Sequence, residues 1–378
     1  MAAVASVLFW AALTVIAYTY VGYPIRLALL SRLRRGHRTA DVISAVDVII
    51  AAYNEQDHIA QKLENTLALD YPANMLRIIV VTDGSTDATP DIVRRYAERG
   101  VILVHQPLRQ GKTAALARAL PHLQGEAILF TDANCALPAQ TVRRMVRHLA
   151  EPKVGGVSGV KRVGQAGTSE GENLYWLYEG WLKTLDSRFG SVMGAPGEVW
   201  LARREAYRVP PPDILLDDFY ASIEMVARGW RVVYEPEAWS LEPASPTLGA
   251  EWRRRVRNAA GGWQAVLRLT NIWRGGVRLL FQYLSHRVLR WMVVPLLLPL
   301  VQVTNLLLLP DPQYVWLLGA QMLFYGAGLA GWILVRKGRR AGLLAAPLAV
   351  CMFNAAALAG GWRYLRGRHT VLWPKVRP

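Results

Sequence analysis

Three short loops between residues 83 and 134 carry polar side chains that can bind a nucleotide and a divalent cation. Asp83 can accept hydrogen bonds from a base or a ribose. Lys112 follows Gly111 at a predicted helix start, where its ammonium and the positive end of the helix can both meet phosphate. Asp132 and Asn134 can direct two oxygens at Mg²⁺ or Mn²⁺, which also binds phosphate oxygens. These side chains predict nucleotide binding.

The same loops follow the strands of a predicted parallel sheet. Apolar runs alternate with helical patterns, as expected for strands that are buried on both faces. Ligands bind such sheets at the carboxyl ends of the strands, where the loops gather. Asp and Asn are also common turn residues, so a plain turn is the alternative at 132–134. The expected strands are 47–51, 76–82, 101–105 and 127–131, the expected helices are 55–69 and 112–123, and the nominated loops are 52–55, 83–86, 110–112 and 132–134.

Several other kinds of site are excluded. Residues 111–113 end like a phosphate-loop motif, but residues 106–110 lack its first glycine, which excludes an ATPase. The first strand is not followed by G-x-G-x-x-G, so a dinucleotide site is not expected. Two cysteines, Cys135 and Cys351, exclude a disulfide scaffold, and the histidines lack metal-ligand spacing.

The distribution of charge indicates membrane segments. The 378 residues carry a net charge of +16, yet residues 1–25 and 341–361 contain no charged side chain, and 291–335 contain only Asp311. A helix needs about 20 apolar residues to cross a bilayer. The sequence therefore predicts an integral membrane protein with a soluble domain. The candidate spans are 2–20, 291–309, 314–335 and 342–359.

Basic residues predict the orientation of these spans. Arginines cluster at 26–38, after the first span, which favours an anchor over a cleaved signal peptide and places the soluble domain in the cytoplasm. The expected location is an inner (plasma) membrane of bacterial type. Three later crossings would leave the basic tail, 362–378, outside, so either the last segment is re-entrant or the tail is exported against its charge.

The segment 252–290 is both basic and aromatic. Such a pattern is typical of nucleic-acid binding or of amphipathic helices on anionic headgroups. Because the segment is contiguous with a predicted span, we expect interface helices in contact with membrane lipids and no nucleic-acid partner.

The ordered motifs resemble the family 2 glycosyltransferases. The resemblance rests on residues 48–55, 81–87, 111–112 and 132–134, continues through 194–197, 216–218 and 254–257, and covers roughly 45–265. It implies an α/β GT-A fold, a Rossmann-like fold that binds nucleotide-diphospho-sugars. With one span before the domain and two to three after it, the chain is similar to the membrane-embedded branch that includes hyaluronan, chitin-oligosaccharide and poly-N-acetylglucosamine synthases. The expected organisation is an anchor at 1–25, a GT-A domain at 41–250, interface helices at 251–290, membrane segments at 291–361 and a basic tail at 362–378.

The resemblance implies roles for individual residues. Asp218 matches the general base, with Asp217 beside it where Glu is usual. Asn134 stands where the main metal ligand is usually Asp, so the implied Mg²⁺ or Mn²⁺ has a neutral, weaker ligand. The implied donor-binding residues are Ala52, Tyr53, Glu55, Asp83, Lys112 and Asp132, the metal ligands Asp132 and Asn134, and the acceptor-binding residues Gly194, Ala195 and Trp263.

Two of the implied motifs have further interpretations. Asp217 and Asp218 also fit acids at a helix start, which the helix dipole favours. Arg254 and Arg257, at i and i+3, face one way and can neutralise a diphosphate leaving group. Asn258 replaces the tryptophan that usually stacks on the acceptor sugar, and Trp263 is the nearest substitute.

The expected activity is inverting transfer of a sugar from a nucleotide-diphosphate donor, expected to be UDP-linked, to a membrane-associated or lipid-linked acceptor. A processive synthase that extends and exports a β-linked polysaccharide is the alternative. A non-catalytic nucleotide-binding membrane subunit is a third hypothesis, which the retained acids and arginines disfavour. The sequence indicates no particular oligomeric state.

Overall fold

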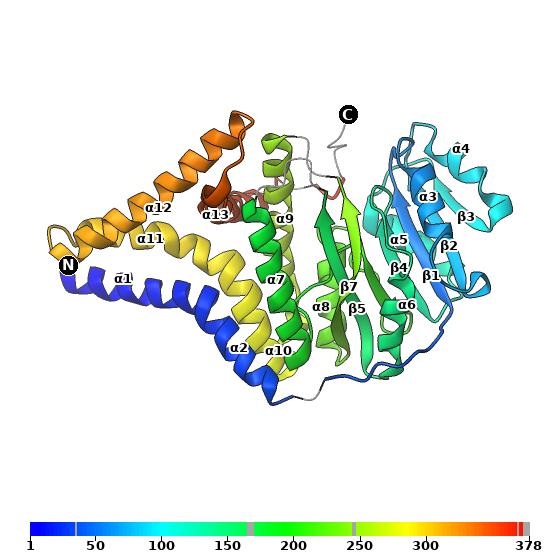
Figure 1. The fold of residues 1–378 in the computed structure, drawn as a ribbon, viewed down its shortest axis with the longest axis horizontal. Helices are drawn as coiled ribbons and strands as arrows, with labels where there is room; N and C mark the ends of the chain where they lie inside the picture. The colour runs from blue at the N-terminus through cyan, green and yellow to red at the C-terminus, as the bar shows by residue number, and fades with distance from the viewer. Residues whose placement is uncertain (35, 165–169, 244–246, 369, 373–378) are drawn as a thin grey trace.

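The structure is a computed structural model that describes residues 1–34, 36–164, 170–243, 247–368 and 370–372. Arg35 and the end of the basic tail, 373–378, lie outside the described residues. An α/β domain carries three long helices, α1, α11 and α12, that project together from one side (Figure 1). Their bounds are Ala2–Ala17 for α1, Val294–Leu307 for α11 and Pro312–Arg336 for α12.

The domain is built on one seven-stranded sheet of order β3-β2-β1-β4-β6-β5-β7. The four predicted strands are confirmed and are mutually parallel. The sheet as a whole is mixed, which corrects the all-parallel expectation, because β6 runs antiparallel to both β4 and β5. Its chain enters from the edge where the loops gather. The strands are β1 Val46–Ala52, β2 Leu76–Asp83, β3 Val101–Gln106, β4 Ala127–Asp132, β5 Val154–Val163, β6 Trp200–Arg203 and β7 Arg231–Glu242.

Helices bury both faces of this sheet. Side chains alternate along a strand, so Val48 and Ile50 of β1 join one apolar cluster with α3 and α6, while Ile49 joins another with α5 and α8. This double burial explains the continuous apolar strands in the sequence. The helices of the domain are α3 Ile59–Leu67, α4 Thr89–Arg94, α5 Lys112–Ala119, α6 Thr141–Val146, α7 Glu170–Phe189 and α8 Asp217–Ala227.

Four helices among the described residues are long and apolar enough to span a membrane: Ala2–Arg32, Gly276–Leu307, Pro312–Arg336 and Gly342–Leu365. The basic segment before the second of them folds as α9, Leu248–Arg268, followed by α10, Gly276–Tyr283, which continues into α11.

The last helix, α13, Ala345–Leu365, lies against the domain. A Cβ placed on Gly360 would approach Ala259 Cβ of α9 to 2.6 Å, so the two helices touch backbone to backbone. The guanidinium of Arg255 on α9 lies 3.9 Å from the ring centroid of Phe353 on α13. Beyond α13, the Val371 carbonyl would lie 3.7 Å from a Cβ on Gly111. The chain therefore returns from α13 to the loop before α5.

Candidate active site

Asp83 holds the loop that precedes α5. Its carboxylate, at the end of β2, accepts hydrogen bonds from the backbone N–H groups of Gln110 (3.0 Å) and Gly111 (2.6 Å). It also forms an ion pair with Arg118, from the next turns of α5. The side chain is almost fully buried. Asp83 thus positions the loop that presents Lys112, a role that no local pattern in the sequence indicates.

The end of β1 supplies a flat aromatic surface. The Arg109 guanidinium stacks on Tyr53, with its central carbon 3.6 Å from the ring centroid. Ala52 is the buried last residue of β1, and the backbone N–H of Glu55 donates to Thr89 Oγ1 at 2.8 Å. The loop at 52–55 therefore lies beside the loop that contains Arg109, as expected for loops at the carboxyl ends of parallel strands.

The Lys112 side chain lies close both to Asp132 and to the predicted general base, Asp218. Its ammonium lies 2.8 Å from Asp132 Oδ1. A Cβ on Gly197 would lie 3.1 Å both from Lys112 Nζ and from Asp218 Oδ2, so the two groups face the same point. Burial raises the pKa of Asp132, but the charge of Lys112 outweighs this effect and keeps the pKa below its usual range. A side chain at Gly197 would crowd both groups, so glycine permits this close approach.

Asp217 and Asp218 are the first two residues of α8. Asp218 Oδ1 accepts a hydrogen bond from the Phe219 N–H at 2.8 Å, which leaves Oδ2 directed at the space beside Gly197. Burial, and next the charge of Asp217, raises the pKa of Asp218 to about 7. A carboxylate with this pKa suits a general base near neutral pH.

The two arginines of the α9 motif have different partners. Arg254 donates to Glu251 on its own helix, at 2.8 and 3.0 Å. The side chain of Arg257 reaches from α9 to the start of α8, where its guanidinium donates to the Leu215 carbonyl at 3.3 Å. Burial lowers the pKa of Arg257 to about 10, against the charges of Asp217 and Asp218, which raise it. Arg257 is thus the nearer of the two to the acids.

The loop at 194–197 packs against α8 beside Asp218. Gly194 has φ +109°, and a Cβ there would lie 2.5 Å from the Phe219 ring. The Ala195 N–H donates to Ser222 Oγ at 3.1 Å. Two of the three predicted acceptor-binding residues, Gly194 and Ala195, therefore lie next to the predicted base.

Trp263 points elsewhere. Its ring would lie 2.5 Å from a Cβ on Gly361, so it packs on α13 rather than on the 194–197 loop. The indole next to Phe219 is Trp291, with ring centroids 4.9 Å apart. In the sequence Trp291 is the first residue of a candidate span, and nothing in its local pattern indicates proximity to the site.

Asp132 and Asn134 offer a partial cation site. Asn134 Oδ1 is buried and has no hydrogen-bond partner in the described chain, so its lone pairs are available to a cation. Beneath the turn, the buried Lys62 donates to Thr131 Oγ1 at 2.7 Å and to the Cys135 carbonyl at 3.0 Å, which fixes the loop. Among the residues described, no three His, Cys, Asp or Glu side chains form a metal cluster. One carboxylate, one amide oxygen and donor phosphate oxygens fit Mg²⁺ or Mn²⁺.

The pKa of Asp218 leads to a prediction for pH dependence. A general base must be ionised, so kcat/KM should fall about tenfold per unit as the pH drops below about 7. Asp217→Asn removes a charge that raises this pKa, and it should move the acid limb to lower pH. Initial rates of the parent and of D217N between pH 5 and 9 measure the shift. An acid limb at the same pH in both proteins would contradict the electrostatic coupling.

Comparison with known proteins agrees with this geometry. Residues 47–209 match the sequence model of the family described as Glycosyl transferase family 2. Poly-beta-1,6-N-acetyl-D-glucosamine synthases of Staphylococcus aureus and Staphylococcus epidermidis are 29% and 26% identical over 238 and 236 residues. Each match covers 60% of this chain but only 57% and 56% of the relative, so the chain matches little more than half the length of these relatives.

One solved structure is similar over nearly the whole chain. It is the mannosyltransferase PcManGT from Pyrobaculum calidifontis in complex with GDP-Man and Mn²⁺. It is 26% identical, covers 96% of this chain and 100% of its own, and superposes with a TM-score of 0.73. The expected GT-A fold is confirmed.

Proposed function

We propose that this chain, whose residues 47–209 form a glycosyl transferase family 2 domain, transfers a sugar from a nucleotide-diphosphate donor to a membrane-associated or lipid-linked acceptor. The observation that carries the proposal is the convergence of Lys112 and Asp218 beside Gly197. One group can neutralise a leaving diphosphate, and the other can deprotonate an acceptor hydroxyl.

The proposed reaction is a single displacement. The Asp218 carboxylate takes the proton of the acceptor hydroxyl while the hydroxyl oxygen attacks the anomeric carbon. The bond to the diphosphate breaks, and Lys112 and Arg257 stabilise the charge that grows on it. One attack from the face opposite the leaving group inverts the anomeric centre.

A panel of nucleotide sugars tests this proposal. We expect a UDP-linked sugar to be used, and the panel includes GDP-mannose because PcManGT was solved with it. Radiolabel should enter the lipid fraction of membranes that contain the protein, and NMR of the product should show a β linkage from an α-linked donor. Transfer from none of the donors, or an α-linked product, would contradict the proposal.

A cation held by Asp132 and Asn134 would supply further charge neutralisation for the diphosphate. Since Asn134 adds no charge, we expect the affinity to be low without a nucleotide. Asn134→Asp should raise the affinity for Mn²⁺ in the presence of a nucleoside diphosphate by on the order of tenfold, because ligand charge tunes cation affinity. Electron paramagnetic resonance of Mn²⁺ measures this without turnover.

Asn134→Ala is the matched control for the cation test. It removes the buried amide oxygen and should weaken Mn²⁺ binding. Equal Mn²⁺ affinities in the parent, N134D and N134A would place the cation elsewhere.

The packing of α13 supports a specific membrane topology. The start of α13 contacts the end of α12, since a Cβ on Gly331 would lie 2.7 Å from the Leu344 carbonyl. The residues after α13 return to Gly111. We infer that α1, α11 and α12 cross an inner (plasma) membrane, that α13 lies on the domain side, and that the domain is cytoplasmic. The basic tail then stays on the cytoplasmic side, as its charge favours.

Polymer synthesis is the second candidate function. The names of the staphylococcal relatives favour it, whereas Asn258 and the position of Trp263 against α13 favour addition of one or a few sugars. The size of the labelled product decides between them: short discrete products support limited addition, and a high-molecular-weight ladder from the purified protein supports a synthase.

A further inference from the structure

A buried arginine, Arg287, joins the segment that leads into α11 to the loop beside the predicted base. It lies on η7, Leu284–Val293, a π-helix between α10 and α11. Its side chain is only 8% exposed. A buried charge is costly unless other groups satisfy it, and π-helical turns are rare and frequent at functional sites. The contacts of this side chain therefore indicate its role.

The guanidinium of Arg287 reaches the start of the 194–197 loop. Its Nε donates a hydrogen bond to the Met193 carbonyl. A Cβ on Gly194 would lie 3.6 Å from its Nη2. This charge-assisted bond to a backbone carbonyl fixes the point at which the chain enters the loop. A hydroxyl of α8 accepts from the Ala195 N–H, so the loop is held between α8 and η7.

Two aromatic rings lie against the same guanidinium. Its central carbon is 4.8 Å from the ring centroid of Trp291 and 5.7 Å from that of Phe219. Phe219 directly follows the predicted base, Asp218, and its ring is also the group that a Cβ on Gly194 would meet. Cations are attracted to the faces of aromatic rings at such distances. Arg287 therefore packs Phe219 and the loop together.

An ion pair with Glu179 does not by itself account for Arg287. Glu179 Oε1 lies 3.5 Å from Arg287, whereas Glu179 Oε2 lies 2.8 Å from Arg290 on the same π-helix. Burial raises the pKa of Glu179, but the charge of Arg290 and of other neighbours outweighs this effect and keeps the pKa well below its usual range. Glu179 is thus ionised and more closely paired with Arg290, while Arg287 makes its hydrogen bond to the Met193 carbonyl.

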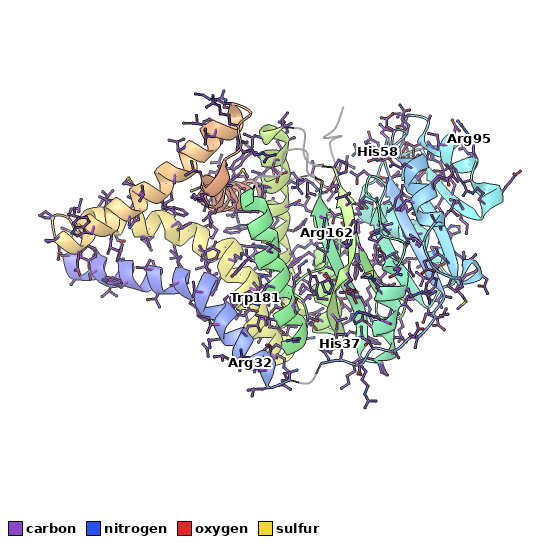
Figure 2. The ribbon with its side chains drawn as sticks, viewed as in Figure 1. Arg32, His37, His58, Arg95, Arg162 and Trp181 are labelled. Carbon is purple, nitrogen blue, oxygen red and sulfur yellow. The ribbon has the colours of Figure 1, made fainter. Side chains whose placement is uncertain are left out.

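Arg290 has different aromatic neighbours. Its guanidinium lies 5.9 Å from the ring centroid of Tyr20 and 5.5 Å from that of Tyr178. Tyr20 belongs to the first long helix and Tyr178 to α7. Helix α7, on which Trp181 is labelled in Figure 2, stands between the sheet and the helices that lead to α1 and α11. Arg290 therefore joins α7 to the first long helix and offers a control on the same π-helix.

We propose that Arg287 is a positioning residue for the acceptor, which holds the 194–197 loop against the start of α8 so that the acceptor hydroxyl reaches Asp218. The proposal rests on the transferase function above and adds a residue outside the range, 45–265, that resembles the family. Arg287 acts through the Met193 carbonyl and the Phe219 ring. Because η7 continues into α11, the position of this loop depends on a helix that we infer to cross the membrane.

Arg287→Met should raise KM for octyl β-glucoside, a membrane-soluble acceptor, by on the order of tenfold or more, because a hydrogen bond from a charged group is lost. Kd for UDP should stay within about twofold of the parent, since Asp83 and Lys112 hold the donor loops through contacts of their own. Steady-state rates and calorimetry measure the two effects. An unchanged KM for the acceptor, or a loss confined to UDP binding, would overturn the proposal.

Two further variants separate positioning from general stability. Arg290→Met removes the closer partner of the same acid and should leave the acceptor KM within about twofold, even if it lowers the melting temperature as much as R287M does. Arg287→Lys keeps the charge and can still donate to the Met193 carbonyl, so it should recover most of the acceptor affinity that R287M loses. Equal KM values for R287M and R290M, or no recovery in R287K, would assign Arg287 to stability alone.

Hydrogen exchange separates this proposal from the transferase proposal. The Ala195 N–H is hydrogen-bonded within the loop that Arg287 is proposed to hold, so R287M should speed its exchange by on the order of tenfold, and R290M should not. Mass spectrometry of peptides that cover 192–197 measures this without donor or acceptor. Unchanged exchange in R287M overturns the positioning role even if sugar is transferred. Absence of transfer by the parent from every nucleotide sugar contradicts the transferase function, and the exchange rates then decide alone whether Arg287 holds the loop.

Discussion

Asp218→Asn should lower kcat by a factor on the order of 100 or more, the usual contribution of a general base. The substitution keeps the size of the side chain and the acceptor oxygen for the Phe219 N–H, so the start of α8 should stay folded. It removes only the ability to take a proton. Transfer rates at pH 8, together with calorimetric Kd values for the nucleotide, should show a slow enzyme that binds its donor normally.

Asp213→Asn is the matched control. Asp213 precedes the same helix, is exposed and pairs with Arg268, so its loss should leave kcat within about twofold. If D218N transfers sugar at the parent rate, Asp218 serves only as an acid at a helix start. The proton acceptor must then be sought among the other acids near Gly197.

Local patterns predicted the strands and the position of the loops. Each of the first four strands is an apolar run, and the polar residues that follow are those that converge at the edge of the sheet. The contact between Asp83 and Arg118 joins residues 35 positions apart. No periodicity reports such a contact. The sequence therefore predicted that Asp83 lies at the end of β2. It did not predict that the Asp83 carboxylate binds Arg118 and the backbone of the loop before α5.

Hydropathy alone could not place α13. Its residues are apolar enough to span a bilayer, but Gly360 and Gly361 face α9, where small residues permit backbone contact. An apolar stretch indicates that a helix is shielded from water, but it does not distinguish a helix in a bilayer from one packed against protein. The packing against α9 and the return of Val371 to Gly111 support the proposed topology, in which α13 lies on the domain side and the number of spans agrees with the charge of the tail.

Strand β6 was not predicted from the sequence, because its local pattern is also uninformative. Its antiparallel direction brings the 194–197 loop to the carboxyl edge of β4. An antiparallel strand of four residues is too short for a clear alternation. This one strand nevertheless determines that Gly197 stands between Lys112 and Asp218.

Lys112→Met should have an effect of comparable size, with a distinct pH signature. The ammonium forms an ion pair with Asp132 and faces the same point beside Gly197 as Asp218. Losing one preorganised charge at a leaving group costs about 10²–10³ in kcat. The charge of Lys112 also lowers the pKa of Asp218. Its removal should therefore move the acid limb above pH 7, opposite to the shift expected for D217N.

The direction of that shift separates an electrostatic role from a structural one. A variant that only loosens the loop before α5 would lose rate at every pH and keep the limb near pH 7. Lys112→Arg retains the charge and should keep the parent pH profile at a reduced rate. Lys153→Met, an exposed lysine removed in the same way, should match the parent in both respects. A K112M enzyme with the parent kcat would show that the diphosphate leaves without this ammonium, and Arg257 together with a cation at Asp132 would then have to neutralise it.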